Sequence, residues 1–104
     1  MSLFAVTREV GPGWTPGKGA FEQPAVNDHA AFMNNLADEG FVLLAGPLAG
    51  SEQDRIRVLL IADAGDESDI HRRLADDPWV RTQQLVTTTV EPWNLAVGAE
   101  RLGV

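Results

Sequence analysis

The sequence predicts an α+β domain with the ferredoxin-like chain order β-α-β-β-α-β. Two segments, 29–36 and 68–76, carry apolar residues at the spacing of an amphipathic helix. Four other segments are short apolar or β-branched runs bounded by glycine, proline or acidic residues, which is typical of strands. In this order the six elements form a four-stranded antiparallel sheet with both helices on one face.

The first strand is expected over Leu3 to Val10, where Phe4 and Val6 point to the same face of the sheet. Gly11 to Gln23 is expected to be a loop, because its Gly-Pro-Gly, Thr-Pro-Gly and Lys-Gly sequences interrupt any regular element. Long ordered loops in small domains are often lids or interface arms. Pro24 to Asp28 then leads into the first helix.

The first helix is predicted from an apolar face that includes a histidine. Asn27 or Asp28 can cap its start by accepting hydrogen bonds from free backbone N–H groups, and Gly40 ends it. The face directed toward the sheet carries His29, Phe32, Met33 and Leu36.

Two strands follow this helix. Phe41 to Leu48 contains no polar side chain, which predicts a strand buried on both faces. Ala49 to Asp54 is expected to be a turn. Arg55 to Ala62 is the third strand, and both of its faces become apolar toward its end.

The second helix and the last strand complete the domain. Asp63 to Glu67 is an acidic entry to a helix over Ser68 to Asp76. The last strand is expected over Thr82 to Val90, with Pro92 ending it. Trp93 to Val104 is a tail of unassigned structure.

The expected helices cover only one face of the sheet, yet the second and third strands have apolar residues on both. Something else must therefore cover the other face. The simplest candidate is the same face of a second subunit, which gives a two-fold dimer closed into a barrel. The alternative is that the Gly11–Gln23 loop and the C-terminal tail fold over it.

Composition restricts the partners. A chain of 104 residues forms one domain, taken as residues 1–104. Its formal charge of −7 makes nucleic acid and anionic membranes poor partners. The sequence has no run of about 18 apolar residues and no signal-peptide pattern, so a cytoplasmic protein is expected.

No cofactor and no metal ion are expected. The chain lacks cysteine, which excludes disulfides, thiolate catalysis and cysteine metal sites. Its histidines and carboxylates do not have metal-ligand spacing, and it has no G-x-S-x-G serine. The glycine segments near the N-terminus are too short and proline-broken to bind a nucleotide phosphate.

His29 and Asp77 are the candidate catalytic residues. The helix N-terminus and burial both disfavour an imidazolium, so His29 can act as a general base. Asp77 precedes Pro78 at the end of the second helix, where the helix dipole disfavours carboxylates. Asp77 can bond one ring nitrogen of His29 and fix its tautomer. The alternatives are a structural histidine bonded to a loop carbonyl and a solvated turn at Asp77.

Four further residues are candidate substrate contacts. Arg8, near the end of the first strand, can bind a substrate anion, or it can be solvated or paired. Gly46 and Pro47 end the second strand, where glycine permits close approach of a ligand or marks a bulge or strand exit. Trp79 is a packing residue or, because it is close to Asp77, a pocket wall.

Five motifs of the chain occur together in one order: His29-Ala-Ala-Phe-Met, Glu39-Gly40, Leu44-Ala-Gly-Pro47, Asp76-Asp-Pro-Trp79 and Val90-Glu-Pro-Trp93. With these motifs the chain resembles, over residues 3 to 93, the YCII-related (YciI-like) family. The resemblance implies a dimeric α+β barrel of ferredoxin-like subunits and a His–Asp active site at His29 and Asp77. Related small dimeric barrels include cofactor-free lyases, isomerases and monooxygenases that act on ring compounds.

The expected function is therefore that of a small cofactor-independent enzyme of lyase or isomerase type. His29 would transfer a proton on a small cyclic or carbonyl-bearing metabolite, with Asp77 orienting it. The alternative is a non-catalytic dimer that binds a small molecule or has a structural role, in which His29 and Asp77 form a structural hydrogen bond. A cofactor-free oxygenase is a third possibility, based on fold analogy alone.

Overall fold

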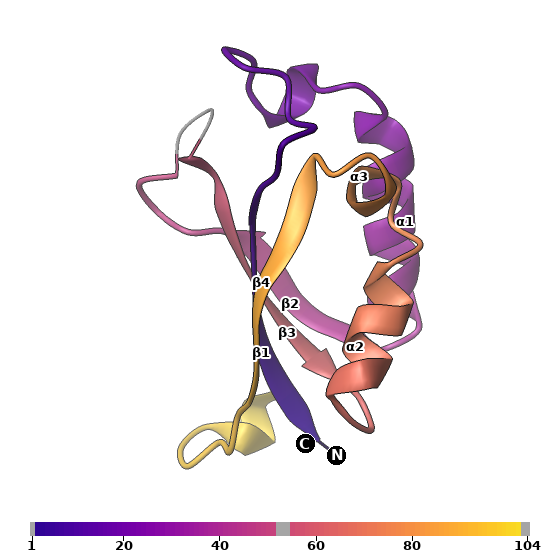
Figure 1. The fold of residues 1–104 in the computed structure, drawn as a ribbon. Coiled ribbons are helices and arrows are strands. Elements are labelled where there is room, and N and C mark those ends of the chain that lie inside the picture. The colour runs from indigo at the N-terminus through magenta and orange to yellow at the C-terminus, as the bar shows by residue number, and fades with distance from the viewer. Residues whose placement is uncertain (1, 52–54, 103–104) are drawn as a thin grey trace.

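A computed structural model describes residues 2–51 and 55–102. The chain forms a four-stranded sheet, and the α-helices lie on one face of it (Figure 1). All neighbouring strands are antiparallel, in the order β2-β3-β1-β4. The predicted ferredoxin-like α+β fold is thus confirmed. The strands are β1 (Leu3–Val10), β2 (Val42–Pro47), β3 (Arg57–Asp63) and β4 (Leu85–Pro92), and the helices are α1 (Val26–Asp38), α2 (Glu67–Leu74) and α3 (Pro78–Arg81).

Helix α1 begins earlier than the capping pattern predicted. Asn27 and Asp28 lie inside its first turn, so neither is its N-cap. That position belongs to Ala25, whose left-handed φ of 62° redirects the chain after Pro24. Gly40 ends the helix as predicted, because its φ of 81° suits a residue without a Cβ.

Helix α3 was not predicted, and it changes the interpretation of Asp77. Helix α2 is capped by Asp66, which accepts from the N–H of Asp69, and ends at Leu74 rather than at Asp76. Asp77 then caps α3, with Pro78 at its first position. The carboxylate therefore lies at a helix N-terminus, where the dipole favours negative charge.

β1 has the predicted bounds, and the remaining boundaries differ from the predictions by one to three residues. β4 begins at Leu85 rather than Thr82, because Gln83 has a left-handed φ of 58° and makes a turn. The predicted loop and tail contain short 3-10 helices, Ala20–Glu22 and Ala99–Leu102. Residues 52–54 of the predicted turn and 103–104 of the tail lie outside the described residues.

The core fills the space between the helices and the inner face of the sheet. β1 and β3 alternate, so Phe4, Val6 and Leu60 point inward. The helices contribute Leu36, Ile70 and Leu74, and the side chains of Ile70 and Leu74 are almost fully buried. This packing fixes α1 and α2 on the sheet, which in turn fixes the site at the start of α1.

The opposite face of the sheet is partly open in the described chain. β2 was expected to be buried on both faces, but Leu44 is 56% exposed. Leu59 and Trp93 are also partly exposed, whereas Leu3 and Ile61 on the same face are buried. The loop before α1 does not cover this face, and the C-terminal segment lies beside one end of the sheet only (Figure 1). Among the described residues, no helix is long and apolar enough to cross a membrane.

Candidate functional site

Asp77 is the centre of a buried polar cluster. Its side chain has no exposed surface and accepts hydrogen bonds from three elements. Arg8 Nη2 on β1 donates to Oδ2 at 2.6 Å, and the backbone N–H of Trp79 donates to Oδ1 at 2.9 Å. His29 Nδ1 on α1 lies 2.8 Å from Oδ1 and 2.9 Å from Oδ2. The expected contact between His29 and Asp77 is therefore present.

The environment of Asp77 keeps it ionised. Burial alone raises the pKa of a carboxyl, because it disfavours the charged form. Hydrogen bonds from His29 and Arg8, together with the positive charge of Arg8, outweigh burial and hold the pKa of Asp77 below its ordinary value of 3.8. Asp77 is thus a carboxylate at neutral pH, and a carboxylate only accepts hydrogen bonds.

This fixes the tautomer of His29. Because Asp77 can only accept, Nδ1 of His29 must carry the proton that lies between them. In the neutral ring Nε2 then has a free lone pair, and it lies on the ring edge directed away from Asp77. No residue in the described ranges 2–51 and 55–102 bonds to Nε2, and the side chain is 17% exposed.

Trp79 supports His29 from a second direction. The two rings are stacked, with centroids 4.0 Å apart and planes 6° apart. Trp79 is itself held by its Nε1–H, which donates to the carbonyl of Pro24 at 2.8 Å, and by an edge-on contact with Trp14. The hydrogen bond to Asp77 and this stack together restrict rotation of the imidazole.

Arg8 is the buried cation that pairs with Asp77. Its side chain is 1% exposed, and besides the bond to Asp77 its Nη1 donates to Met33 Sδ, a weak acceptor, at 3.5 Å. Its Nε is buried and has no partner among the described residues. A buried carboxylate paired with a buried guanidinium leaves the cluster uncharged when His29 is neutral.

A cavity of about 460 Å³ opens beside His29. Its walls come from α1, the loop before it and the adjoining ends of β2 and β3, and they are mostly apolar or aromatic. Arg8 also reaches it, and none of the described lining residues is acidic. The predicted contacts Gly46, Pro47 and Trp79 all line it, together with Trp14, Phe21, Val26, Met33, Ile56, Val58 and Leu85.

The loop before α1 is fixed to the rest of the site. Gln23 is buried, and its side chain bonds the backbone of Thr15 and of Lys18. Gln84 on the other side donates to the carbonyl of Pro24 at 3.0 Å. Gly13 packs so tightly that a Cβ there would lie 1.9 Å from the backbone oxygen of Thr82. The loop is therefore a fixed wall of the cavity.

Trp14, Gln23 and Gln84 were not identified as site residues from the sequence. Glutamines in a loop and before a strand have no local pattern that predicts burial, and their partners are up to 61 residues away. Only the loop's length and its Gly-Pro-Gly sequence pointed to a specialised segment.

No group of three or more His, Cys, Asp or Glu side chains suited to a metal ion is found in the described part of the chain. The second histidine, His71, lies on α2 with its side chain 55% exposed. The site thus rests on one histidine and one carboxylate.

Among protein families, no family model matches this chain, and no curated protein matches it by sequence. Among solved structures it is similar to a 5-chloro-2-hydroxyhydroquinone dehydrochlorinase, TftG, from Burkholderia phenoliruptrix AC1100, in complex with 2,5-dihydroxybenzoquinone. The TM-score is 0.61 at 22% sequence identity, over 88% of this chain and 93% of the other. At this identity the similarity establishes the fold.

Proposed function

We propose that the protein is a small cofactor-independent enzyme in which His29 transfers a proton and Asp77 orients it. The observation that carries this proposal is the free Nε2 of His29 at an apolar cavity, with Nδ1 bonded to a buried carboxylate. A base held in one tautomer and one orientation is the arrangement that general base catalysis requires.

The proposed substrate is a small cyclic or carbonyl-bearing compound. Nε2 takes a proton from a C–H next to a carbonyl, and the C–H electron pair moves into the conjugated carbonyl as an enolate. Asp77 stabilises the imidazolium that forms. In an isomerisation His29 returns the proton to another carbon of the conjugated system. In an elimination the electron pair instead expels a leaving group from the adjacent carbon, and the leaving group departs with its bonding electrons.

The lining of the cavity supports a ring compound. Trp79, Gly46 and Pro47, the substrate contacts predicted from the sequence, are among its walls. Mostly apolar and aromatic walls favour a flat, weakly polar ligand over a sugar or a nucleotide. The dehydrochlorinase of similar fold was solved with a small ring compound, 2,5-dihydroxybenzoquinone, which is therefore a reasonable first probe.

The proposed active form is a homodimer. Leu44 on β2 and Leu59 on β3 are exposed on neighbouring strands, on the face of the sheet away from the helices, with Leu44 opposite Ile61 and Leu59 opposite Gly46. A second copy placed against this face would bury them. Light scattering of the purified protein should give twice the chain mass, and Leu59→Glu should give the monomer mass. A monomeric wild type would contradict the dimer.

The proposed chemistry is tested by hydrogen exchange. A panel of cyclic ketones, cyclic enones and 2,5-dihydroxybenzoquinone is incubated with protein in D2O, and NMR follows the loss of ring C–H signals. We expect at least one compound to exchange faster with wild type and with His71→Gln, whose histidine is on the surface, but not with His29→Gln. If His29→Gln retains the wild-type rate, the assignment of His29 is wrong.

A second function, that of a non-catalytic binding protein, is favoured by the hydrogen bonds of Asp77, because both of its carboxylate oxygens are bonded within the chain. This carboxylate joins β1, α1 and α3, which is what a structural pair in a non-catalytic binding protein would do. A structural pair costs about 1–3 kcal/mol of stability when one partner is lost. A His29→Gln variant that loses this much stability, while neither it nor wild type accelerates exchange of any compound, would favour the binding protein.

A further inference from the structure

Trp14 has a buried hydrogen-bond donor that the chain does not use. Its side chain is only 5% exposed, and its indole N–H has no partner among residues 2–51 and 55–102. The neighbouring Trp79 differs, because its N–H donates to Pro24. Buried donors without a partner are rare in folded proteins, and each one calls for an explanation.

The position of Trp14 gives that explanation. Trp14 lines the same cavity as His29, and so does Arg8, whose Nε is also a buried donor without a partner among the described residues. No acidic side chain lies among the described lining residues. Two residues of the cavity wall therefore carry buried N–H groups that the described chain leaves unused, which suits a ligand that brings its own acceptor oxygen.

Trp14 and His29 are also close enough to act on one small molecule. Trp79 lies between them, edge-on to Trp14 at 5.5 Å between ring centroids and stacked on His29 at 4.0 Å. An engineered apolar cavity of about 150 Å³ holds a benzene. The 460 Å³ beside these residues has room for a substituted ring that reaches both.

We propose that Trp14 is a substrate-binding residue whose indole N–H donates to a ring carbonyl of the substrate, after a small turn of the side chain toward the cavity. The proposal rests on the proposed function and narrows it to cyclic compounds that carry a conjugated carbonyl, such as enones, quinones and cyclic 1,3-diones. As His29 removes the proton, negative charge develops on the carbonyl oxygen, and a donor placed there stabilises it.

The test compares two rings of equal size in calorimetric titrations. Cyclohexane-1,3-dione has a carbonyl acceptor, and resorcinol has hydroxyls at the same positions. Trp14→Phe keeps an aromatic ring but removes the N–H. We expect this variant to bind the dione roughly tenfold more weakly, which is the value of one hydrogen bond, and resorcinol within about twofold of wild type. Equal loss for both probes, or no binding of the dione to wild type, would overturn the proposal.

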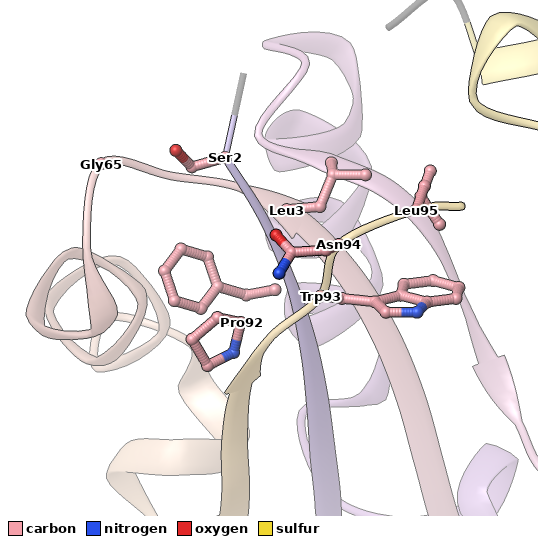
Figure 2. A pocket seen from close by; sticks show the side chains of 8 residues that line it. Ser2, Leu3, Gly65, Pro92, Trp93, Asn94 and Leu95 are labelled. Atoms are coloured by element: carbon pink, nitrogen blue, oxygen red, sulfur yellow. The ribbon is translucent and has the colours of Figure 1, made fainter. Parts of the chain in front are cut away.

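Trp93→Phe is the matched control. Trp93 lies at the opposite end of the sheet, in a separate pocket beside Ser2 and Leu3 (Figure 2). Trp93→Phe also loses an indole N–H, but at a residue that does not line the cavity beside His29. The affinities for the dione and for resorcinol should therefore equal those of wild type. A loss of dione binding in Trp93→Phe as large as in Trp14→Phe would also overturn the proposal.

A second measurement on wild type does not depend on the folding of Trp14→Phe. The chain has three tryptophans, so three indole N–H signals appear in a 1H–15N spectrum, and Trp79→Phe and Trp93→Phe identify the third by elimination. The dione should shift the Trp14 signal downfield and resorcinol should not. If the signal shifts but no compound exchanges protons, the carbonyl subsite stands and the enzymatic function fails. If exchange depends on His29 but the Trp14 signal stays in place, only the subsite fails.

Discussion

The indole of Trp79 lies flat against the imidazole of His29, with 4.0 Å between ring centroids and 6° between ring planes. The same residue donates its backbone N–H to Asp77, which holds Nδ1 of that imidazole. One tryptophan thus contributes to both contacts that orient the base. The carboxylate of Asp77 restricts rotation of the imidazole within its own plane, and the indole of Trp79 restricts tilting of the imidazole out of that plane.

Trp79→Leu should therefore lower the rate of proton exchange strongly while the protein still folds. Without the stack the imidazole can tilt, and misplacement of a catalytic group by about 1 Å costs on the order of a hundredfold in rate. The exchange assay on the most responsive compound measures the rate, and circular dichroism shows whether the fold is retained. A folded Trp79→Leu protein with the wild-type rate would show that the stack does not position His29.

Asp77→Asn should destabilise the protein strongly. The substitution removes the negative charge between two donors and leaves Arg8 buried without a countercharge, which costs about 3–5 kcal/mol. Asp76→Asn is the control, because the Asp76 side chain is 70% exposed. Urea unfolding should show a large loss for Asp77→Asn and a change within about 0.5 kcal/mol for Asp76→Asn. Equal free energies of unfolding for the two variants would contradict this account.

Acid should remove the stability that Asp77 provides. The folded-state pKa of Asp77 is lowered, so the folded protein binds this proton less readily than the unfolded chain, where an aspartate titrates near about 3.9. The contribution is therefore fully present above about pH 5 and is lost as the pH falls through the folded-state pKa. The difference in unfolding free energy between wild type and Asp77→Asn should therefore shrink as the pH falls below about 4. A difference that grows as the pH falls below about 4 would contradict the lowered pKa of Asp77.

Gly13→Ala should disturb the cavity by displacing its loop. The added Cβ would lie 1.9 Å from the backbone oxygen of Thr82, so the loop must move away from the turn before β4, and Trp14 moves with it. Gly65→Ala is the control, since a Cβ there meets nothing within 4 Å. We expect Gly13→Ala to weaken probe binding and to lower the unfolding midpoint in urea, and Gly65→Ala to do neither. Wild-type binding by Gly13→Ala would show that the loop does not shape the cavity.

The sequence was sufficient for the fold class, and it indicated that His29 and Asp77 could be in contact. Hydrophobic periodicity is a local property, and it identified both long helices and all four strands. The histidine at the start of one helix and the carboxylate before Pro78 could be placed together because the ferredoxin-like order brings those two helix ends to one edge of the layer.

The rest of the site depends on long-range packing. Asp77 was interpreted as a poorly placed helix C-terminal acid, because the one-turn helix α3 that it caps is too short to show periodicity. The pairing of Arg8 with Asp77 joins residues 69 apart in sequence, so it was only one of several interpretations of a lone strand arginine. The glutamines that hold the loop are likewise paired only through the folded chain.

The most direct test of the central claim is the proton position on His29. In a long-range 1H–15N spectrum of the protein labelled at histidine, recorded at a pH where the ring is neutral, the two histidines are distinguished with His71→Gln. We predict that Nδ1 of His29 carries the proton and that Nε2 is the unprotonated, pyridine-type nitrogen. A His29 with its proton on Nε2 would mean that Asp77 does not hold the ring as a base toward the cavity, and it would contradict the proposed mechanism.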